Sequence, residues 1–385
     1  MACRKEFRQP FPYVNGARGG ILLSDAAIAR FLLCKSPPLA YSAPEVPGEI
    51  PVVDAVGVGL NATDTLIRVP RFPALDSKLE FTSAVVGPGG QVASALVACQ
   101  FWGLRTRYIG KVGDDDAAEL QRAEFARAGV EAHLVNVPAC ASQAAYILID
   151  ETCGERTILW KRDPRLAVLP EELEREWVVR ARALLVDGHD TAAAVLAARW
   201  AREAGIPIPV VADIDNIYPG IEGLLENVDY LLASREFPAR LTGEANLFAS
   251  LPAIHHDYRS RVTGVTLGKQ GALAWDGVRF HYAPAYRVDA VDTTGAGDIF
   301  HGAFVYSVVG GWPLARALDF SCAAAGLNCI AVGARGGIAP LAEIERLMRE
   351  GEHHEAAYTA EELARRATTA SRAARSQTKV QGTPQ

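Results

Sequence analysis

The sequence has few of the features that mark membrane, secreted or nucleic-acid-binding proteins. It contains no uncharged apolar run of about 18 residues, so no transmembrane helix is expected. Its net charge is −6, and no excess of basic residues argues for nucleic acid or an anionic membrane surface as a partner. The N-terminal segment has no apolar core ending in small residues, so no signal peptide is predicted.

Paired cysteines are also lacking. The seven cysteines stand singly, and none forms a C-x-x-C pair. An odd number of scattered cysteines favours reduced thiols over a disulfide framework, and we therefore expect a cytoplasmic protein. The chain has 385 residues, of which 49% are hydrophobic and 22% charged. This is ordinary globular composition, and the length suffices for one large α/β domain or two smaller ones.

One stretch, residues 291–304, has the pattern of a tight turn that leads into a helix. Its small residues Gly295, Ala296 and Gly297 let the backbone approach a ligand closely. The first-turn N–H groups of a helix have no intrahelical partner, and with the helix dipole they favour an anion such as phosphate. Asp298 follows in the first turn. It is either a helix-dipole partner or a general base that takes a proton from an attacking hydroxyl.

From Asp292 to Asp298 this string resembles the D-T-x-G-A-G-D signature of the PfkB (ribokinase-like) carbohydrate kinases. The resemblance implies that Asp298 is the catalytic base and that Gly295, Ala296 and Gly297 form an anion hole for the transferred phosphoryl group. It further implies an α/β protein with a three-layer α/β/α fold, a mostly parallel central sheet and a small β lid. ATP and Mg²⁺ are the implied cofactors.

A second glycine pattern, Gly57-x-Gly59-x-x-Ala62, formally fits a dinucleotide-binding fingerprint. That fingerprint requires a helix directly after the glycines. Residues 63–69 are instead strand-like, and Pro70 follows them. We therefore interpret this region as the first strand of the kinase fold and not as a Rossmann motif.

The resemblance places the acceptor sugar against Asn61, Asp64, Gly89, Gly90 and Gln91. A carboxylate that accepts two hydroxyl protons is a suitable ligand for a polyol, although Asp64 could equally be a surface turn residue. The glycine-rich segment that ends at Gly90 is expected to be a turn that opens a helix. Gln91 stands where the family commonly has Asn, which keeps the amide but adds a methylene.

Strands and helices alternate regularly from about residue 183, which predicts a parallel sheet covered on both faces. By resemblance, the turn that contains Thr266, Gly268 and Gly271 contacts the nucleotide, and Cys322 lines the adenine pocket. A buried cysteine is more often a plain core residue.

Two metal assignments also follow from the resemblance. Many family members carry N-x-x-E after a strand, where the Glu organises Mg²⁺. Residues 234–237 are a degenerate form of this motif, with Glu236 one place away from the expected position. The closing loop at residues 331–338 is expected to shape a monovalent-cation site with Asp292 and Thr294, and K⁺ is the candidate ion.

The resemblance covers residues 51–350 and sets the predicted domain boundaries. The expected parts are a poorly structured N-terminal extension at 1–50, a kinase domain at 51–350 whose lid lies at about 66–82 and 142–160, and a C-terminal tail at 351–385 that is mostly disordered after one helix at 359–366.

Taken together, these patterns predict an ATP-dependent kinase that phosphorylates a sugar hydroxyl. The signature region is most similar to ketose kinases such as fructokinase, ketohexokinase and sulfofructose kinase, which favours a ketohexose-like acceptor. A homodimer formed through the lid is a candidate assembly. One alternative is a nucleoside kinase of the same family, with aromatic or apolar side chains around the base. The other is a non-catalytic sugar- or nucleotide-binding relative, which the intact Asp298 disfavours and the degenerate motif near Glu236 favours.

Overall fold

The computed structural model describes residues 52–381, with side chains described up to residue 370. Its main element is a nine-stranded sheet of order β13-β12-β11-β10-β9-β8-β1-β4-β5. All neighbouring strands pair in parallel except β11–β12 and β12–β13, which are antiparallel. The strands are β1 (Ala55–Val58), β4 (Thr106–Val112), β5 (Glu131–Asn136), β8 (Leu184–Asp187), β9 (Val210–Ile214), β10 (Tyr230–Ser234), β11 (Val262–Thr266), β12 (Ala272–Trp275) and β13 (Phe280–Ala283). The predicted mostly parallel sheet is confirmed.

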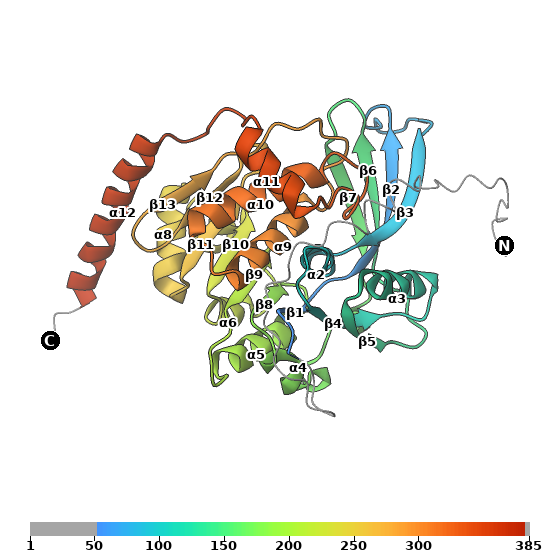
Figure 1. The fold of residues 1–385 in the computed structure, drawn as a ribbon, viewed down its shortest axis with the longest axis horizontal. Helices are drawn as coiled ribbons and strands as arrows, with labels where there is room; N and C mark the ends of the chain where they lie inside the picture. The colour runs from blue at the N-terminus through green and yellow to red at the C-terminus, as the bar shows by residue number, and fades with distance from the viewer. Residues whose placement is uncertain (1–51, 382–385) are drawn as a thin grey trace, which may run out of the picture. The chain divides into compact units, whose positions relative to one another are not determined.

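Helices cover both faces of this sheet and give the predicted three layers (Figure 1). The helices of one face are α2 (Gln91–Phe101), α3 (Asp116–Ala128), α9 (Ala296–Val309), α10 (Leu314–Asn328) and α11 (Leu341–Glu350). Those of the other face are α4 (Arg175–Val179), α5 (Thr191–Arg202), α6 (Ile221–Leu225), α7 (Phe237–Thr242) and α8 (Leu247–Tyr258). Adjacent strand residues alternate between the two cores: Leu185 packs under the first layer, and Leu184 and Val186 under the second. This alternation explains why the strands are apolar throughout.

A separate four-stranded sheet of order β3-β2-β6-β7, referred to below as the lid because it includes much of the predicted lid region, stands at one end of the main sheet (Figure 1). Its strands are β2 (Ala62–Val69), β3 (Ser83–Gly89), β6 (Ala144–Asp150) and β7 (Arg156–Lys161). The expected turn before Gly90 is wrong, because β3 continues through the glycines and pairs Gly89 with Ala62. A side chain at Gly89 would collide with the carboxylate of Asp64. Glycine is therefore tolerated in this edge strand, where it makes room for a neighbouring side chain.

The chain after residue 351 has more structure than expected in its described part. Helix α12 (Ala360–Gln381) continues well beyond the predicted end at residue 366. Ala367 and Ala370 are buried with Leu251 of α8 and Trp275 of β12, so packing adds to the high helix propensity of its alanines. The predicted extension at 1–50 and residues 382–385 lie outside the described residues. No helix within 52–381 is both long and apolar enough to cross a membrane.

Helices α2 and α9 lie against each other at Gly302, and this contact can be tested. A Cβ atom added there would lie 2.7 Å from the carbonyl oxygen of Ala95. We expect Gly302→Ala to lower the free energy of unfolding by about 1–3 kcal/mol, because overpacking forces the helices apart. Gly223→Ala in α6 is the control, since its added Cβ would lie 3.7 Å from the nearest atom. Equal stabilities of the two variants in urea unfolding would contradict the close contact.

Candidate active site

The N-terminus of α9 begins at a left-handed glycine. Gly295 has φ 75° and caps the helix, and a side chain there would collide with the backbone of Ala334. Both facts require glycine at this position. An added Cβ at Gly297 would meet nothing within 4 Å, so this residue faces open space. The Ala296 N–H donates to the carbonyl of Thr293, which leaves the next first-turn amides as the more accessible donors of the predicted anion hole.

Asp298 stands in the first turn of α9, as predicted. Burial raises the pKa of its carboxyl from the ordinary 3.8 to about 6, and the nearby guanidinium groups of Arg156 and Arg335 lower it. A carboxyl with a pKa near 6 is mostly ionised at neutral pH and is more basic than a solvated aspartate. Both properties suit a general base.

The predicted acceptor residues Asn61, Asp64, Gly89 and Gly90 lie together where β1, the lid and α2 meet. Gly90 has φ 96°, and a side chain there would collide with the backbone of Asn61. The amide nitrogen of Asn61 donates to the Tyr108 hydroxyl (2.7 Å) and to the carbonyl of Lys111 (3.0 Å). Both N–H groups of the Asn61 side chain are therefore used within the protein. Only its side-chain oxygen remains to accept a hydrogen bond from the sugar that is phosphorylated.

Asp64 is buried on the inner face of the lid. Burial raises the pKa of its carboxyl to about 7; nearby Asp298 raises it further, and Arg335 lowers it. Asp64 lies against Gly89, whose carbonyl accepts from Arg335, and the neighbouring Ala334 lies against Gly295, three residues before Asp298. The structure therefore brings the two predicted carboxylates together.

Gln91 lies at the start of α2 and is linked to a carboxylate that the sequence analysis did not single out. Its side chain lies near Asp213 of β9 and lowers the pKa of that carboxyl, while its Oε1 is buried without a partner. Burial, followed by the charge of Asp298, raises the pKa of Asp213 well above its ordinary value. His301 of α9 contacts Asp213 Oδ2 (3.2 Å) and the carbonyl of Gly297 (2.7 Å). These contacts join the first turns of α2 and α9.

Two arginines that the sequence analysis left without a role reach the same region. Arg335 of the closing loop donates through Nε to Ser94 Oγ (3.2 Å) and through Nη2 to the carbonyl of Gly89 (3.0 Å). Arg156 of the lid strand β7 donates to Thr293 Oγ1 (2.7 Å), just before α9. The only sequence signal for Arg335 was its place in the closing loop, and for Arg156 its place in the lid hairpin.

An aromatic wall extends from the lid to the ends of β8 and β9. The Trp160 ring meets the His189 ring edge-on, with 6.1 Å between centroids. The Tyr218 hydroxyl lies 3.1 Å from His189 Nε2 and donates to Asp215 (2.8 Å). Asp190 is the N-cap residue of α5, but its side chain makes no capping hydrogen bond and instead pairs with Arg162 (2.7 Å).

The loop around the predicted monovalent-cation site is held by Asp292. Its buried carboxylate accepts the Thr294 N–H and the Gly333 N–H, both at 2.8 Å. Asn328 of α10 donates to the carbonyls of Thr294 and Ala334. Thr294 Oγ1 is buried without a partner. A buried hydroxyl oxygen without a hydrogen-bond partner, next to the buried Asp292 carboxylate, is compatible with binding of a cation that prefers oxygen ligands.

Two of the predicted nucleotide residues, Gly271 and Cys322, lie against one carbonyl, that of Ala283. Thr266 ends β11, and Gly268 and Gly271 follow with φ 58° and 92°. A side chain at Gly271 would collide with the carbonyl of Ala283, and Cys322 Sγ lies 3.7 Å from the same oxygen. The turn and α10 thus form one corner beyond β11. Cys322 itself is a buried core residue, and burial raises the pKa of its thiol.

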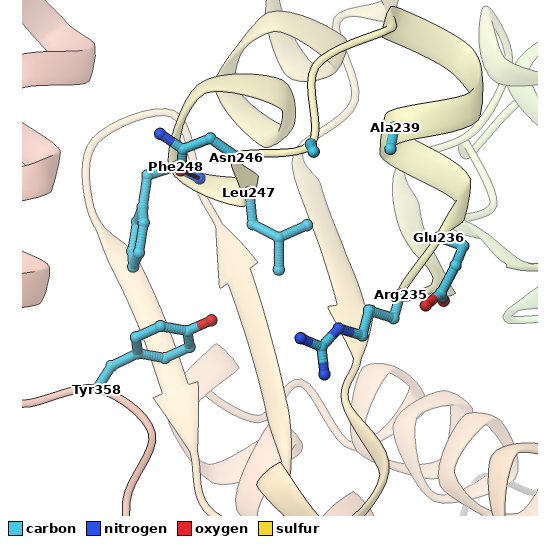
Figure 2. A pocket seen from close by; sticks show the side chains of 8 residues that line it. Arg235, Glu236, Ala239, Asn246, Leu247, Phe248 and Tyr358 are labelled. Carbon is cyan, nitrogen blue, oxygen red and sulfur yellow. Dashed lines mark hydrogen bonds between the residues drawn. The ribbon is translucent and has the colours of Figure 1, made fainter.

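Glu236 lies at the start of α7, shortly after the end of β10. It is exposed and borders a cavity of about 470 Å³, with Arg235 beside it and Phe248 and Tyr358 opposite (Figure 2). Arg235 donates to Gln270 of the predicted nucleotide turn, so the cavity adjoins that turn (2.9 Å). Among the described residues, no three His, Cys, Asp or Glu side chains cluster as a metal site. The assignment of Glu236 to a metal stays a prediction.

Comparison with known proteins agrees with this geometry. The model of the pfkB family of carbohydrate kinases matches residues 49–341. The chain belongs to this family. It is therefore a sugar or nucleoside kinase, and the resemblance noted in the sequence is confirmed.

Similar proteins in the pfkB family differ in the acceptor that their names state. The chain is 31% identical to an ATP-dependent ribose-1-phosphate kinase of Halopiger xanaduensis, over 76% of this chain and 96% of the relative. It is 26% identical to fructokinase-2 of Solanum habrochaites, over 69% and 88%. A solved structure of a candidate ribokinase from Agrobacterium tumefaciens is similar with a TM-score of 0.72 and 29% identity, and covers 78% of this chain and 98% of that one.

The raised pKa of Asp64 predicts a stability difference that depends on pH. Its folded-state pKa of about 7 exceeds the ordinary 3.8, so ionisation of Asp64 opposes folding. The cost is absent below pH 3.8 and complete above pH 7. We expect Asp64→Asn to be more stable than wild type by roughly 2–4 kcal/mol at pH 8, with the difference vanishing near pH 4.

Urea unfolding at several pH values measures this difference. Asp257→Asn is the matched control, because Asp257 is exposed at the end of α8. If the difference in free energy of unfolding between Asp64→Asn and wild type stayed constant from pH 4 to 8, burial would not raise the pKa of the Asp64 carboxyl.

Proposed function

We propose that this pfkB-family protein transfers the γ-phosphoryl group of ATP to a sugar hydroxyl, with Asp298 as general base. The observation that carries the proposal is that Asp298 stands in the open first turn of α9, to which the lid around Asp64 is linked through Gly89, Arg335 and Ala334. In this arrangement Asp64 accepts hydroxyl protons of the acceptor, and Asp298 removes the proton from the attacking one. The first-turn amides at Gly297 stabilise the phosphoryl oxygens. Gly295 and Ala296 shape that turn.

The acceptor side consists of Asn61, Asp64, Gly89, Gly90 and Gln91, under the lid. A ketohexose-like sugar fits the fructokinase relative, whereas the first relative acts on a sugar phosphate by its name. A nucleoside is the second candidate. It is favoured by Trp160, a residue that is 58% exposed and whose ring lies next to that of His189. Turnover of ketoses, aldoses and nucleosides in a coupled ADP-release assay separates these acceptors.

ATP is placed along the corner formed by Thr266, Gly268, Gly271 and Cys322. Its phosphates would then reach toward α9 across the ends of the intervening parallel strands, where open α/β sheets bind ligands. Mg²⁺ would arrive with the ATP phosphates, since this ion needs only one or two protein carboxylates. Glu236 is the proposed carboxylate on that side. K⁺ is proposed between Asp292 and Thr294, where it would steady the loop that precedes the anion hole.

The base assignment can be tested by Asp298→Asn. Because the amide cannot accept the proton, we expect kcat to fall by roughly 10²–10⁴-fold, while ATP still raises the melting temperature. The control is Asp257→Asn, which removes an exposed carboxylate far from α9. Turnover like that of wild type in Asp298→Asn would remove the base assignment. If neither wild type nor control consumed ATP with any acceptor, the kinase function itself would be wrong.

We also propose that the lid mediates a homodimer. Cross-strand pairing puts Val86, Thr65, Tyr146 and Leu159 in one row across the lid. Because side chains alternate along a strand, this row lies on the face opposite to Asp64. Val86, Tyr146 and Leu159 are 57%, 56% and 58% exposed. A second copy of the same apolar row would cover it.

Charging the row should separate the copies. We expect the double variant Tyr146→Glu, Leu159→Glu to sediment as a monomer where wild type sediments as a dimer, because the new charges would be buried without partners. Ile206→Glu is the control, since Ile206 is an exposed apolar residue away from the lid. Identical sedimentation of wild type and the lid variant would exclude this interface.

A further inference from the structure

His301 of α9 brings both of its ring nitrogens against carbonyl oxygens. Nδ1 lies 2.7 Å from the carbonyl oxygen of Gly297, and Nε2 lies 2.8 Å from that of Leu232 in β10. A neutral imidazole has one N–H and one lone pair, and a carbonyl oxygen only accepts. In either neutral form, one nitrogen lone pair would therefore face an oxygen lone pair at hydrogen-bond distance. Both contacts become hydrogen bonds only when the ring carries two protons, as an imidazolium.

Asp213 of β9 is the counter-ion that such a ring requires. Its Oδ2 lies 3.2 Å from His301 Nδ1, and both side chains are buried. Burial by itself favours the neutral form of each group, because it lowers the pKa of His301 and raises that of Asp213. A proton on Asp213, however, would leave the Gly297 carbonyl against an unprotonated nitrogen. In the ion pair the two charges offset each other and both carbonyl contacts are hydrogen bonds.

The surroundings of the pair favour retention of its proton. Three further carboxylates raise the pKa of Asp213, namely Asp298 of α9, Asp215 after β9 and Asp187 at the end of β8. Gln91 of α2 lowers it. Loss of the proton would give the pair a net negative charge among these carboxylates. The pair therefore keeps one proton, and the two carbonyl contacts place it on the ring of His301.

The contact reaches the proposed base through one peptide group. The Gly297 carbonyl and the Asp298 N–H belong to the same planar unit, so holding the carbonyl fixes the direction of the N–H. That N–H lies in the first turn of α9, whose amides have no partner within the helix. A hydrogen bond from a charged donor also polarises the peptide and strengthens its N–H as a donor. His301 is thus linked to the anion hole and to the backbone that carries the Asp298 side chain.

We propose that His301 is a positioning residue for phosphoryl transfer. As an imidazolium paired with Asp213, it holds the peptide between Gly297 and Asp298 in the orientation that the anion hole and the base need. The inference rests on the proposed kinase function and adds to it a buried residue that touches no substrate. A plain packing role differs from this one, because a neutral side chain can fill the space without holding both carbonyls.

The protonation state can be read from the ring-nitrogen chemical shifts of ¹⁵N-histidine-labelled full-length protein. At pH 8, where a histidine of ordinary pKa is neutral, we expect a ring with protons on both nitrogens. His301→Gln should remove its signal. Asp213→Asn, which keeps His301 in place, should convert the signal to that of a neutral ring, because the counter-ion is lost. If His301→Gln removed the signal of a neutral ring instead, the proposal would be overturned.

Kinetics test whether the ring acts on the reaction, with an acceptor found in the ADP-release assay. We expect His301→Gln and Asp213→Asn to lower kcat by roughly 10–100-fold and to change KM for ATP by less than about threefold. The reason is that misalignment of the base affects the chemical step more than nucleotide binding. His256→Gln is the matched control and should keep wild-type kinetics, since His256 is exposed on α8.

A double variant shows whether His301 acts through the base. His301→Gln should slow Asp298→Asn by a smaller factor than it slows wild type, because part of its effect passes through the Asp298 carboxylate. Equal factors in the two backgrounds would show that the residues act independently and would contradict the positioning of the base.

The remaining failures are distinct. If His301 is doubly protonated but both single variants keep the wild-type kcat, the positioning role is wrong while the kinase function stands. Losses that come from KM alone would assign the pair to substrate binding and overturn the proposal as well. If no acceptor is phosphorylated and ATP does not stabilise the protein, the kinase function is wrong and the positioning role falls with it.

Discussion

The arrangement of the site depends on burying several carboxylates in a small volume. Asp64 and Asp213 are buried and Asp298 is partly buried, and burial is the largest cause of the raised pKa of each. The charge of Asp298 also raises the pKa of Asp64 and of Asp213, so the three cannot all be ionised without compensation. The first-turn amides of α9 and the guanidinium groups of Arg156 and Arg335 supply that compensation. The fold must therefore hold the lid, the closing loop and two helix N-termini close together.

Glycines make this convergence sterically feasible. Gly89 leaves room for the Asp64 carboxylate, and Gly90 lets α2 begin against Asn61. Gly295 combines a left-handed backbone with close contact to the closing loop at Ala334. In each case a side chain would force apart two segments that are distant in the sequence. These glycines therefore allow distant segments of the chain to pack closely, in addition to letting a ligand approach the backbone.

Long-range polar contacts then fix the loops. Asp292 ties the start of the α9 turn to Gly333, and Arg335 ties the closing loop to the lid at Gly89. Arg156 and Gly154 link the lid hairpin to Thr293. The lid is thus attached directly to the segment that leads into the proposed anion hole. Movement of the lid would change the surroundings of Asp298, which couples acceptor enclosure to the proposed base.

Much of the fold was predictable because its signals are local. Apolar strands that alternate with helices indicated the parallel sheet, and Gly295 to Asp298 indicated a helix N-terminus with a carboxylate in its first turn. Local patterns failed where a distant partner decides the conformation. The glycines before Gly90 form a strand because they pair with β2, and α12 extends because Ala367 and Ala370 pack on distant elements.

By itself, the sequence determined the family, the layer architecture and the position of Asp298 at the start of α9. Only the tertiary structure showed that Asp213 and His301 support the two helix termini, and that Arg335 reaches Gly89 with one donor left over. The reason is physical: a helix start is encoded within a few neighbouring residues. The burial of a charge and its partners depend on segments that the chain brings together only when it folds.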